Sequence, residues 1–222
     1  MKRKCIFRII TEFSIIGFFI IISSMCLRSK DIEIDMYPIK AQSVRGHEDY
    51  IDPEEGDVLL LENLQTSNYI KDNSGIDYSI KSARGGLRTQ AWCIHGDGKG
   101  EWFKADIPES QLIQYKGIMN VYRVLIQNGL VANKELYFAN NRVKTIGIEF
   151  SEGEKRLLHL NDGDFDFQYF RINIKARWFK MTIKDVYKGT RYNDTCVGKI
   201  LFETMEHPNE MSPEKRKRYG YE

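Results

Sequence analysis

The sequence lacks the features that define several common classes of protein. Its net charge is only +2, because 33 lysines and arginines nearly balance 31 aspartates and glutamates. This balance excludes the strongly basic patch of a nucleic-acid-binding domain, so we expect no nucleic-acid partner. The sequence has no C-x-x-C pair, which argues against a zinc ribbon or a thioredoxin-like redox site.

Patterns that carry enzymatic chemistry are missing as well. We find no G-x-S-x-G nucleophile elbow, no H-E-x-x-H and no phosphate-binding Gly-Lys loop. The Gly-rich run Ile94–Glu101 precedes a strand instead of opening a helix, so it is interpreted as a loop. The histidines lie far apart, with no two at a metal-ligand spacing: they are His47, His95, His159 and His207. We expect no catalytic activity; the alternative is an enzyme whose site these patterns do not reveal.

Residues 1–26 resemble an export signal. A basic start is followed by an apolar run, Phe13–Ile22, which is shorter than the roughly 20 residues that span a membrane. The residues before Cys26 are similar to the lipobox of bacterial lipoproteins, although Ser23 and Met25 depart from its usual pattern. We predict an exported protein, either secreted or anchored to the membrane by a lipid on Cys26. The alternative is an uncleaved anchor extended back to Ile9.

Export changes how the cysteines are interpreted. Cys5 and Cys26 belong to the export segment, which leaves Cys93 and Cys196 in the body of the chain. An even pair in an oxidising compartment suggests one disulfide. The alternative is two buried free thiols that act as small apolar groups.

Composition divides the remaining chain into three segments. Residues 27–75 bury too little apolar surface to offset chain entropy, so we predict a tether with a short strand or helix at Asp57–Leu64. Residues 207–222 are predicted to be a polar tail. The domain itself is expected at residues 76–206.

Within this domain, apolar and polar residues alternate along short runs. A period of two predicts strands, each with one inward and one outward face. The runs are Gly100–Ile107, Asn120–Gly129, Arg142–Phe150, Lys155–Asp162, Arg177–Tyr187 and Val197–Phe202. Several short strands with almost no helical period predict an all-β fold, an antiparallel β-sandwich or jelly roll.

One predicted loop is rich in carboxylates. The run Asn161–Phe167 contains three aspartates, whose oxygen atoms are suitable ligands for calcium. The run lacks the twelve-residue loop and the terminal glutamate of an EF-hand. A turn with solvated carboxylates is the alternative. We expect no cofactor and leave calcium open.

Four blocks of the sequence resemble the NADase-type glycan-binding domain of exported bacterial proteins. They are AWC…GDGKGEWFKADI, VLIQNGL…Y…NNRVKTIGIEF, LLHLND and FKMTIKDVYKGTRYNDTCVGKILF, in the family's order between Ala91 and Phe202. The resemblance implies a discoidin-like, galactose-binding-like jelly roll. It also implies a non-catalytic module, because this domain accompanies a secreted NAD glycohydrolase whose catalytic domain has no counterpart in the sequence.

Two positions depart from the family pattern. The family usually has a glutamate soon after its first tryptophan and another just before its final apolar residues, where this sequence has Ile94 and Lys199. If those carboxylates serve binding or a metal, this chain has lost that part. The resemblance further implies that the first and last segments lie side by side, which would bring Cys93 and Cys196 within bridging distance.

The implied fold favours a binding surface on the loops at one end of the sandwich. Such loops vary while the sheets stay rigid, and sugars suit aromatic rings together with amide, carboxylate and guanidinium groups. The residues that offer these groups are Trp92, Asn140, Asn141, Arg142, Tyr187, Arg191, Tyr192, Asn193 and Asp194. A structural role is the alternative for each, such as a core position for Trp92 or a turn cap for Asp194.

We therefore expect the β-sandwich of this exported or membrane-anchored protein to bind a cell-surface glycan without catalysis. The alternative is an adaptor on the cell envelope that uses the same fold to bind another protein.

The N-terminal assignment predicts the effect of replacing Cys26. If this cysteine carries the lipid, Cys26→Ala should release the protein from the membrane fraction or leave an unprocessed precursor. Fractionation and immunoblotting measure both outcomes. Unchanged processing and fractionation would contradict lipidation and leave an ordinary signal or an uncleaved anchor.

Overall fold

The computed structural model describes residues 37–43, 57–71, 75–84, 90–114, 116–204 and 212–218. The predicted export signal, with Cys26, and much of the predicted tail lie outside these residues. Within the described ranges, no helix has the length and apolar character needed to cross a membrane.

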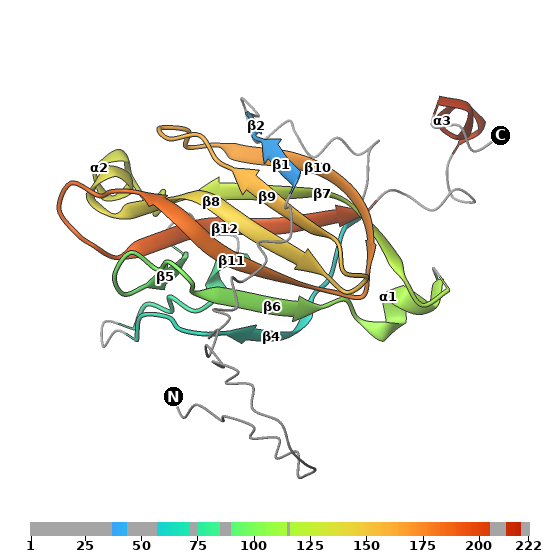
Figure 1. Ribbon diagram of the computed structural model, residues 1–222, viewed down its shortest axis with the longest axis horizontal. Helices are drawn as coiled ribbons and strands as arrows, with labels where there is room; N and C mark the ends of the chain where they lie inside the picture. Colours follow the sequence, from blue (N-terminus) through green and yellow to red (C-terminus); the bar gives the residue numbers. More distant parts are fainter. Residues whose placement is uncertain are drawn as a thin grey trace, which may run out of the picture. The chain divides into compact units, whose positions relative to one another are not determined.

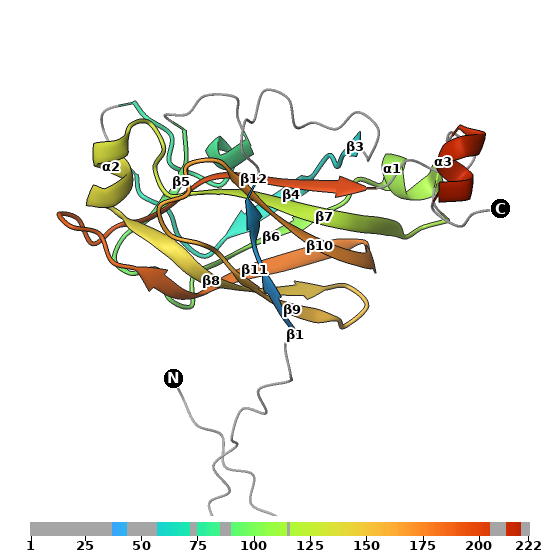
Figure 2. The same ribbon diagram turned by 90° about the horizontal axis from the view of Figure 1, so that it is seen from above.

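The strands pack in two layers that together make up one sheet of 12 strands. The first layer contains β2 (Gln42–Ser43), β10 (Phe167–Ala176), β7 (Met119–Asn128) and β12 (Thr195–Thr204), with β3 (Asp57–Val58) and β5 (Trp92–Ile94) along β12. The second contains β1 (Tyr37–Lys40), β9 (Lys155–His159), β8 (Asn141–Phe150), β11 (Trp178–Tyr187), β6 (Trp102–Asp106) and β4 (Glu62–Thr66). Figure 2 shows β7 and β12 in one layer and β8 and β11 in the other.

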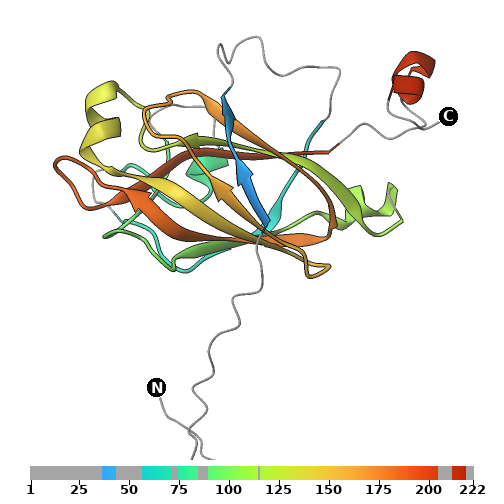
Figure 3. The ribbon, with the colours of Figure 1, turned by 45° about the horizontal axis from the view of Figure 1, so that its top comes forward.

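The two layers are joined at one end, where β12 pairs in parallel with β8. Thr195 lies opposite Asn141, and Cys196 lies opposite Arg142. Helix α2 (Lys134–Ala139) lies at this joined end and α1 (Glu109–Gln114) at the other, as Figures 1 and 3 show. The remaining helices are η2 (Ser82–Arg84) and α3 (Pro213–Arg218). The predicted all-β sandwich of jelly-roll type is confirmed, with the sheet mixed because β8 and β12, like β1 and β9, pair in parallel.

The core lies between the layers and follows the predicted alternation. Buried side chains include inward-facing residues of three central strands: Phe103 and Ala105 on β6, Ile146, Ile148 and Phe150 on β8, and Phe179, Met181 and Ile183 on β11. Aromatic rings connect the layers: Trp92 contacts Phe103, which contacts Phe179, which stacks on Phe202 at 3.7 Å. Each fully buried ring contributes about 1.5–3 kcal/mol by leaving water.

The segment predicted as a tether differs from that expectation where the structure describes it. β1 pairs with β9, β2 with β10 and β4 with β6, and Leu59 is buried with its N–H bonded to the carbonyl oxygen of Phe202. The described parts of 27–75 therefore belong to the sandwich. These segments cover sheet edges whose backbone groups would otherwise lack partners, and such a role needs little apolar sequence.

Strand β10 is another element that was not among the predicted strands. Its buried residues alternate with exposed ones from Phe170 to Ala176, so the period-two signal is present in the sequence. β10 pairs with β7 along nearly the whole length of both strands, on the side of β7 away from β12. It therefore extends the first layer beyond β7.

The predicted disulfide between Cys93 and Cys196 is confirmed. The two residues lie directly opposite each other in the antiparallel β5–β12 pairing, with α-carbons 4.1 Å apart. Cys93 directs its backbone N–H to Tyr78 and its carbonyl to Ile70, away from β12. The cysteines thus form a pair without mutual backbone bonds, the arrangement in which facing residues approach closest. The bridge fastens the short strand β5 to β12.

We expect removal of this bridge to destabilise the domain. It closes a loop between residues 103 positions apart, for which chain-entropy arguments give about 4–5 kcal/mol, and native bridges in small domains contribute about 2–5 kcal/mol. The double variant Cys93→Ala, Cys196→Ala should therefore have a free energy of unfolding about 2–5 kcal/mol lower than that of the wild type, measured by urea titration.

Reductant provides the control for this measurement. It should lower the stability of the wild type and leave the double variant unchanged. Equal stability of the two oxidised proteins would contradict a stabilising role for the bridge.

Candidate functional site

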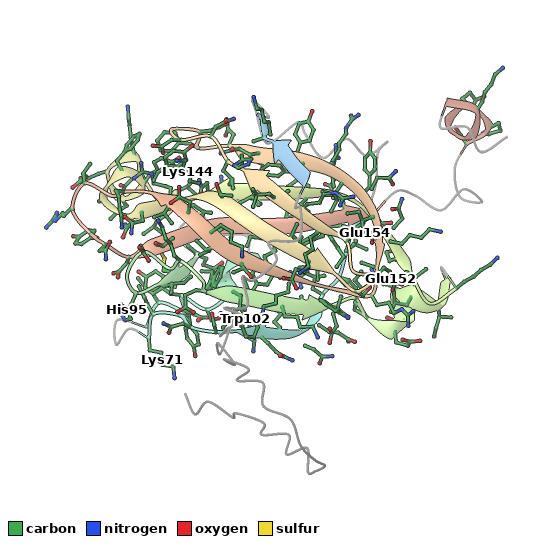
Figure 4. All side chains as sticks on the ribbon, in the orientation of Figure 1. Lys71, His95, Trp102, Lys144, Glu152 and Glu154 are labelled. Carbon is green, nitrogen blue, oxygen red and sulfur yellow. A yellow bond between two sulfur atoms is a disulfide. The ribbon has the colours of Figure 1, made fainter. Side chains whose placement is uncertain are left out.

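The candidate site lies at the joined end of the sandwich. It is formed by the β5–β6 loop, residues 95–101, and the β11–β12 loop, residues 188–194. Figure 4 shows His95 and Lys144 at this end and Glu152 and Glu154, on the β8–β9 turn, at the opposite end. The two loops touch each other, because the backbone N–H of Gly96 donates to the carboxylate of Asp194 at 3.4 Å. The hydroxyl of Thr195, the first residue of β12, also donates to the carbonyl of Gly96 at 2.9 Å.

Asn141 anchors the β11–β12 loop. Its side chain is only 1% exposed. The amide nitrogen donates to the carbonyl of Asn193 at 2.6 Å, and the amide oxygen accepts the backbone N–H of Gly189 at 2.7 Å. The backbone N–H of Asn141 donates to the carbonyl of Asp194. One buried side chain thus fixes both ends of the loop.

Arg142 anchors three neighbouring segments. Its guanidinium pairs with Asp162 at 2.8 Å and donates to the carbonyls of Asn140 and Lys188. Its buried side chain lies 5.4 Å from the ring centroids of Tyr137 and Phe138 on α2. Because these bonds involve most of the guanidinium, Arg142 acts as part of the frame.

Residues at the end of α2 complete this frame. Asn140 is buried and caps the helix by donating its side-chain N–H to the carbonyl of Leu136. Burial, with the nearby charge of Asp162, raises the pKa of Tyr137 to about 12. Gly129 has φ +74°, and a Cβ there would lie 2.9 Å from the Tyr137 ring, so the turn after β7 requires glycine.

The backbone of the β11–β12 loop lies directly on the end of α2. The N–H groups of Arg191 and Tyr192 both donate to the carbonyl of Ala139, and Thr190 donates to that of Phe138. A Cβ on Gly189 would lie 2.6 Å from the carbonyl carbon of Asn140. The loop therefore has a fixed backbone even though it forms no helix or strand.

The tip of this loop faces solvent. Arg191, Tyr192 and Asn193 are exposed, Tyr192 by 41%. The Arg191 guanidinium lies 5.1 Å from the centroid of the Tyr192 ring. Asp194 is partly exposed, and its carboxylate accepts the N–H of Gly96 and faces the ring nitrogen of His95, each at 3.4 Å.

Ion pairs connect the loops to the neighbouring strands. Asp185 on β11 pairs with Lys99 at 2.9 Å and with Lys144 at 3.3 Å. The hydrogen bond from Lys99, together with the one from Lys144, lowers the pKa of Asp185 to about 2. Across the two loops, Lys188 lies 3.9 Å from Asp97.

The structure divides the predicted binding residues into two groups. Trp92 is 2% exposed, and its indole N–H donates to the carbonyl of Asn68, so it lies in the core. Tyr187 is partly buried, and its hydroxyl donates to the carbonyl of Leu160. These two and the frame residues Asn140, Asn141 and Arg142 lie under or beside the surface, whereas Arg191, Tyr192, Asn193 and Asp194 form it.

We did not predict from the sequence that side chains of the β5–β6 loop lie at the candidate site. His95, Asp97 and Lys99 lie beside the predicted loop and contact it or its strand. The signal was the Gly-rich run itself: Gly96 and Gly98 have φ of +75° and +62°, a conformation that favours glycine and turns the chain sharply.

The two departures from the family pattern lie on strands. Ile94 is fully buried in the core, and Lys199 on β12 is 7% exposed. Burial lowers the pKa of Lys199. Of the residues considered for calcium, Asp162 is paired with Arg142. Among the described residues, no three histidine, cysteine or acidic side chains are placed to hold a metal ion.

Comparison with known proteins agrees with this fold. The sequence model of the family described as "NAD glycohydrolase translocation F5/8 type C domain" matches residues 56–203, which confirms the resemblance found in the sequence. No curated protein matches the chain.

Similar solved structures come from ZmpB of Clostridium perfringens. Its CBM32-1 and CBM32-2 domains match with a TM-score of 0.54 at 12% identity, over 78% of this chain and 44% of that one. The same domains in complex with GalNAc match at 0.53 and 10%, over 78% and 41%. A structure that adds the M60 catalytic domain matches at 0.51 and 9%, over 80% and 18%. The chain spans less than half the length of these structures, and the likeness shows the fold alone.

The lowered pKa of Asp185 predicts an acid-sensitive contribution to stability. A carboxyl with a folded pKa of about 2 and an unfolded pKa of about 3.9 stabilises the fold above pH 4 and loses this effect as the pH falls to 2. Asp185→Asn should therefore be less stable than the wild type at pH 6 and equally stable at pH 2.

Thermal melts between pH 2 and pH 6 measure this difference. Glu154→Gln is the control, because it removes an exposed carboxylate at the end opposite Lys144. A gap between wild type and Asp185→Asn that stays constant with pH would contradict the assignment.

Proposed function

We propose that this chain, which belongs to the family of NAD glycohydrolase translocation F5/8 type C domains, is a non-catalytic module that binds carbohydrate. The proposed binding surface is the tip of the β11–β12 loop, with Arg191, Tyr192, Asn193 and Asp194. The neighbouring His95 on the β5–β6 loop completes it.

One observation carries the proposal: exposed polar and aromatic side chains stand on a rigid frame. The loop backbone is bonded to Ala139 and to Asn141, so binding would not have to order it. A preorganised loop keeps the binding free energy that a flexible loop would lose as entropy.

The chemistry of the exposed groups suits a sugar. An aromatic ring such as that of Tyr192 packs against the C–H face of a pyranose. The amide of Asn193 and the carboxylate of Asp194 offer a donor and acceptors to ring hydroxyls. The side chains that can make both kinds of contact lie within one loop, residues 188–194.

The CBM32 domains support this proposal through their shared fold. The ZmpB domains were solved with GalNAc, a property of that protein. For the present chain, glycan binding, export and attachment to the membrane through Cys26 are proposals. They fit a family that is described by translocation of an NAD glycohydrolase.

A glycan array probed with the soluble domain would first identify a ligand. We expect Tyr192→Ala and Asp194→Ala to weaken the binding of that glycan. Loss of one ring contact worth about 0.5–1.5 kcal/mol corresponds to roughly 2- to 10-fold weaker binding. Calorimetric titration measures the affinity.

Glu154→Ala is the matched control, because Glu154 is an exposed carboxylate at the opposite end. It should bind as the wild type does, and all three variants should melt near the wild-type temperature. Full affinity in both loop variants would place the site elsewhere. Binding to no glycan would favour the protein adaptor.

A further inference from the structure

The charged side chains around the two loops differ in whether they have a partner of opposite charge. Each aspartate of these loops, and Asp185 on the adjoining strand β11, has a cationic or N–H partner: Asp97 with Lys188, Asp185 with Lys99 and Lys144, and Asp194 with His95 and Gly96. Arg191 differs. Within the described part of the chain, its guanidinium contacts the Tyr192 ring and no carboxylate.

The position of Arg191 is fixed at its backbone. Its N–H donates to the carbonyl of Ala139 at 3.1 Å, and the N–H of Tyr192 donates to the same oxygen at 2.8 Å. The backbone N–H of Gly189 also donates to the side-chain oxygen of Asn141 at 2.7 Å, which holds the start of the loop in place. The Arg191 side chain therefore starts from a defined place, and its guanidinium contacts the Tyr192 ring.

The contact with Tyr192 leaves the N–H donors of the guanidinium available. These donors lie in the plane of the guanidinium, and within the described residues no hydrogen bond or ion pair uses those of Arg191. This fork matches the two oxygens of a carboxylate, with which arginine forms two parallel bonds. Lys188, on the same loop, already faces Asp97, whereas Arg191 faces no carboxylate among the described residues.

We propose that the ligand of this site is an acidic glycan, and that Arg191 binds the carboxylate of a uronic or sialic acid residue. This inference rests on the proposed function, because it assigns the chemical class of the sugar bound at the same surface. In the complex, the Arg191 fork holds the carboxylate, and Tyr192 packs against the C–H face of the sugar. Asn193 and Asp194 bond to its hydroxyls.

The test compares acidic and neutral glycans on the full soluble domain. Oligosaccharides that end in sialic acid, oligouronates and neutral galactosides are titrated in parallel. The same acidic glycans with their carboxylates methyl-esterified form the fourth arm. The wild type should bind one of the acidic classes and lose at least 10-fold in affinity when its carboxylate is esterified.

Variants of Arg191 test the role of the fork. Arg191→Gln should weaken binding of the acidic glycan by about 10- to 100-fold, the loss of a charge-assisted bidentate pair. Arg191→Lys keeps the charge without the fork and should recover only part of this loss. Arg177→Gln is the control, because Arg177 is also exposed, with 60% of its side chain in solvent, and lies on the turn before β11.

The outcomes separate this inference from the proposed function. Binding of neutral galactosides with equal or greater affinity than acidic glycans would overturn the inference and leave the proposed function standing. Binding of no glycan would overturn both. Binding to vesicles of anionic phospholipid, lost in Arg191→Gln, without binding of any acidic glycan would also overturn the inference.

Discussion

The buried amide of Asn141 is the interaction on which the loop-bearing end of the molecule depends. It stands at the first residue of β8, opposite Thr195, where the two layers meet. From there it bonds to Asn193 and to Gly189. A buried polar group that loses its partners destabilises the fold by about 1–3 kcal/mol. A change in the loop that removes the partners of this amide therefore carries that cost. The layer junction and the loop are therefore stabilised together.

The disulfide acts on the same strand from the other side. Cys196 follows Thr195 on β12 and binds covalently to β5, while Thr195 and Cys196 also pair with β8. The first two residues of β12 thus have neighbours on both sides. Because the β5–β6 loop continues from β5, this arrangement also determines where His95 and Gly96 lie relative to the β11–β12 loop. Strand pairing at Thr195 and Cys196 therefore holds the two loops of the candidate site in place.

Much of the fold could be predicted from local pattern. Period-two alternation identified the strands that contain Phe103, Ile148 and Phe179, because a buried face imposes that period directly. The pairing of Tyr37–Lys40 with β9 could not be predicted in this way. It depends on backbone bonds between segments far apart in the sequence, and backbone bonds leave no mark on side-chain composition.

The division of the predicted binding residues into buried and exposed ones could not be predicted from the sequence either. Asn141 and Asn193 have the same side chain, yet one is buried under the loop and the other is exposed on it. Residue type indicated that this part of the chain is rich in hydrogen-bonding groups. Only the spatial neighbours decide whether such a group bonds within the protein or remains available to a ligand.

This division has a physical logic that applies to the site as a whole. A buried polar side chain without a partner destabilises a fold, and Asn140, Asn141 and Arg142 direct their hydrogen bonds to the backbone around them. That commitment keeps the exposed loop in one conformation. Under the proposed function, specificity would then depend on the exposed side chains. Arg191 can change without disturbing the frame because its backbone, and not its guanidinium, bonds to Ala139. A fold built in this way can keep its stability while its ligand preference changes through one or two residues at the loop tip.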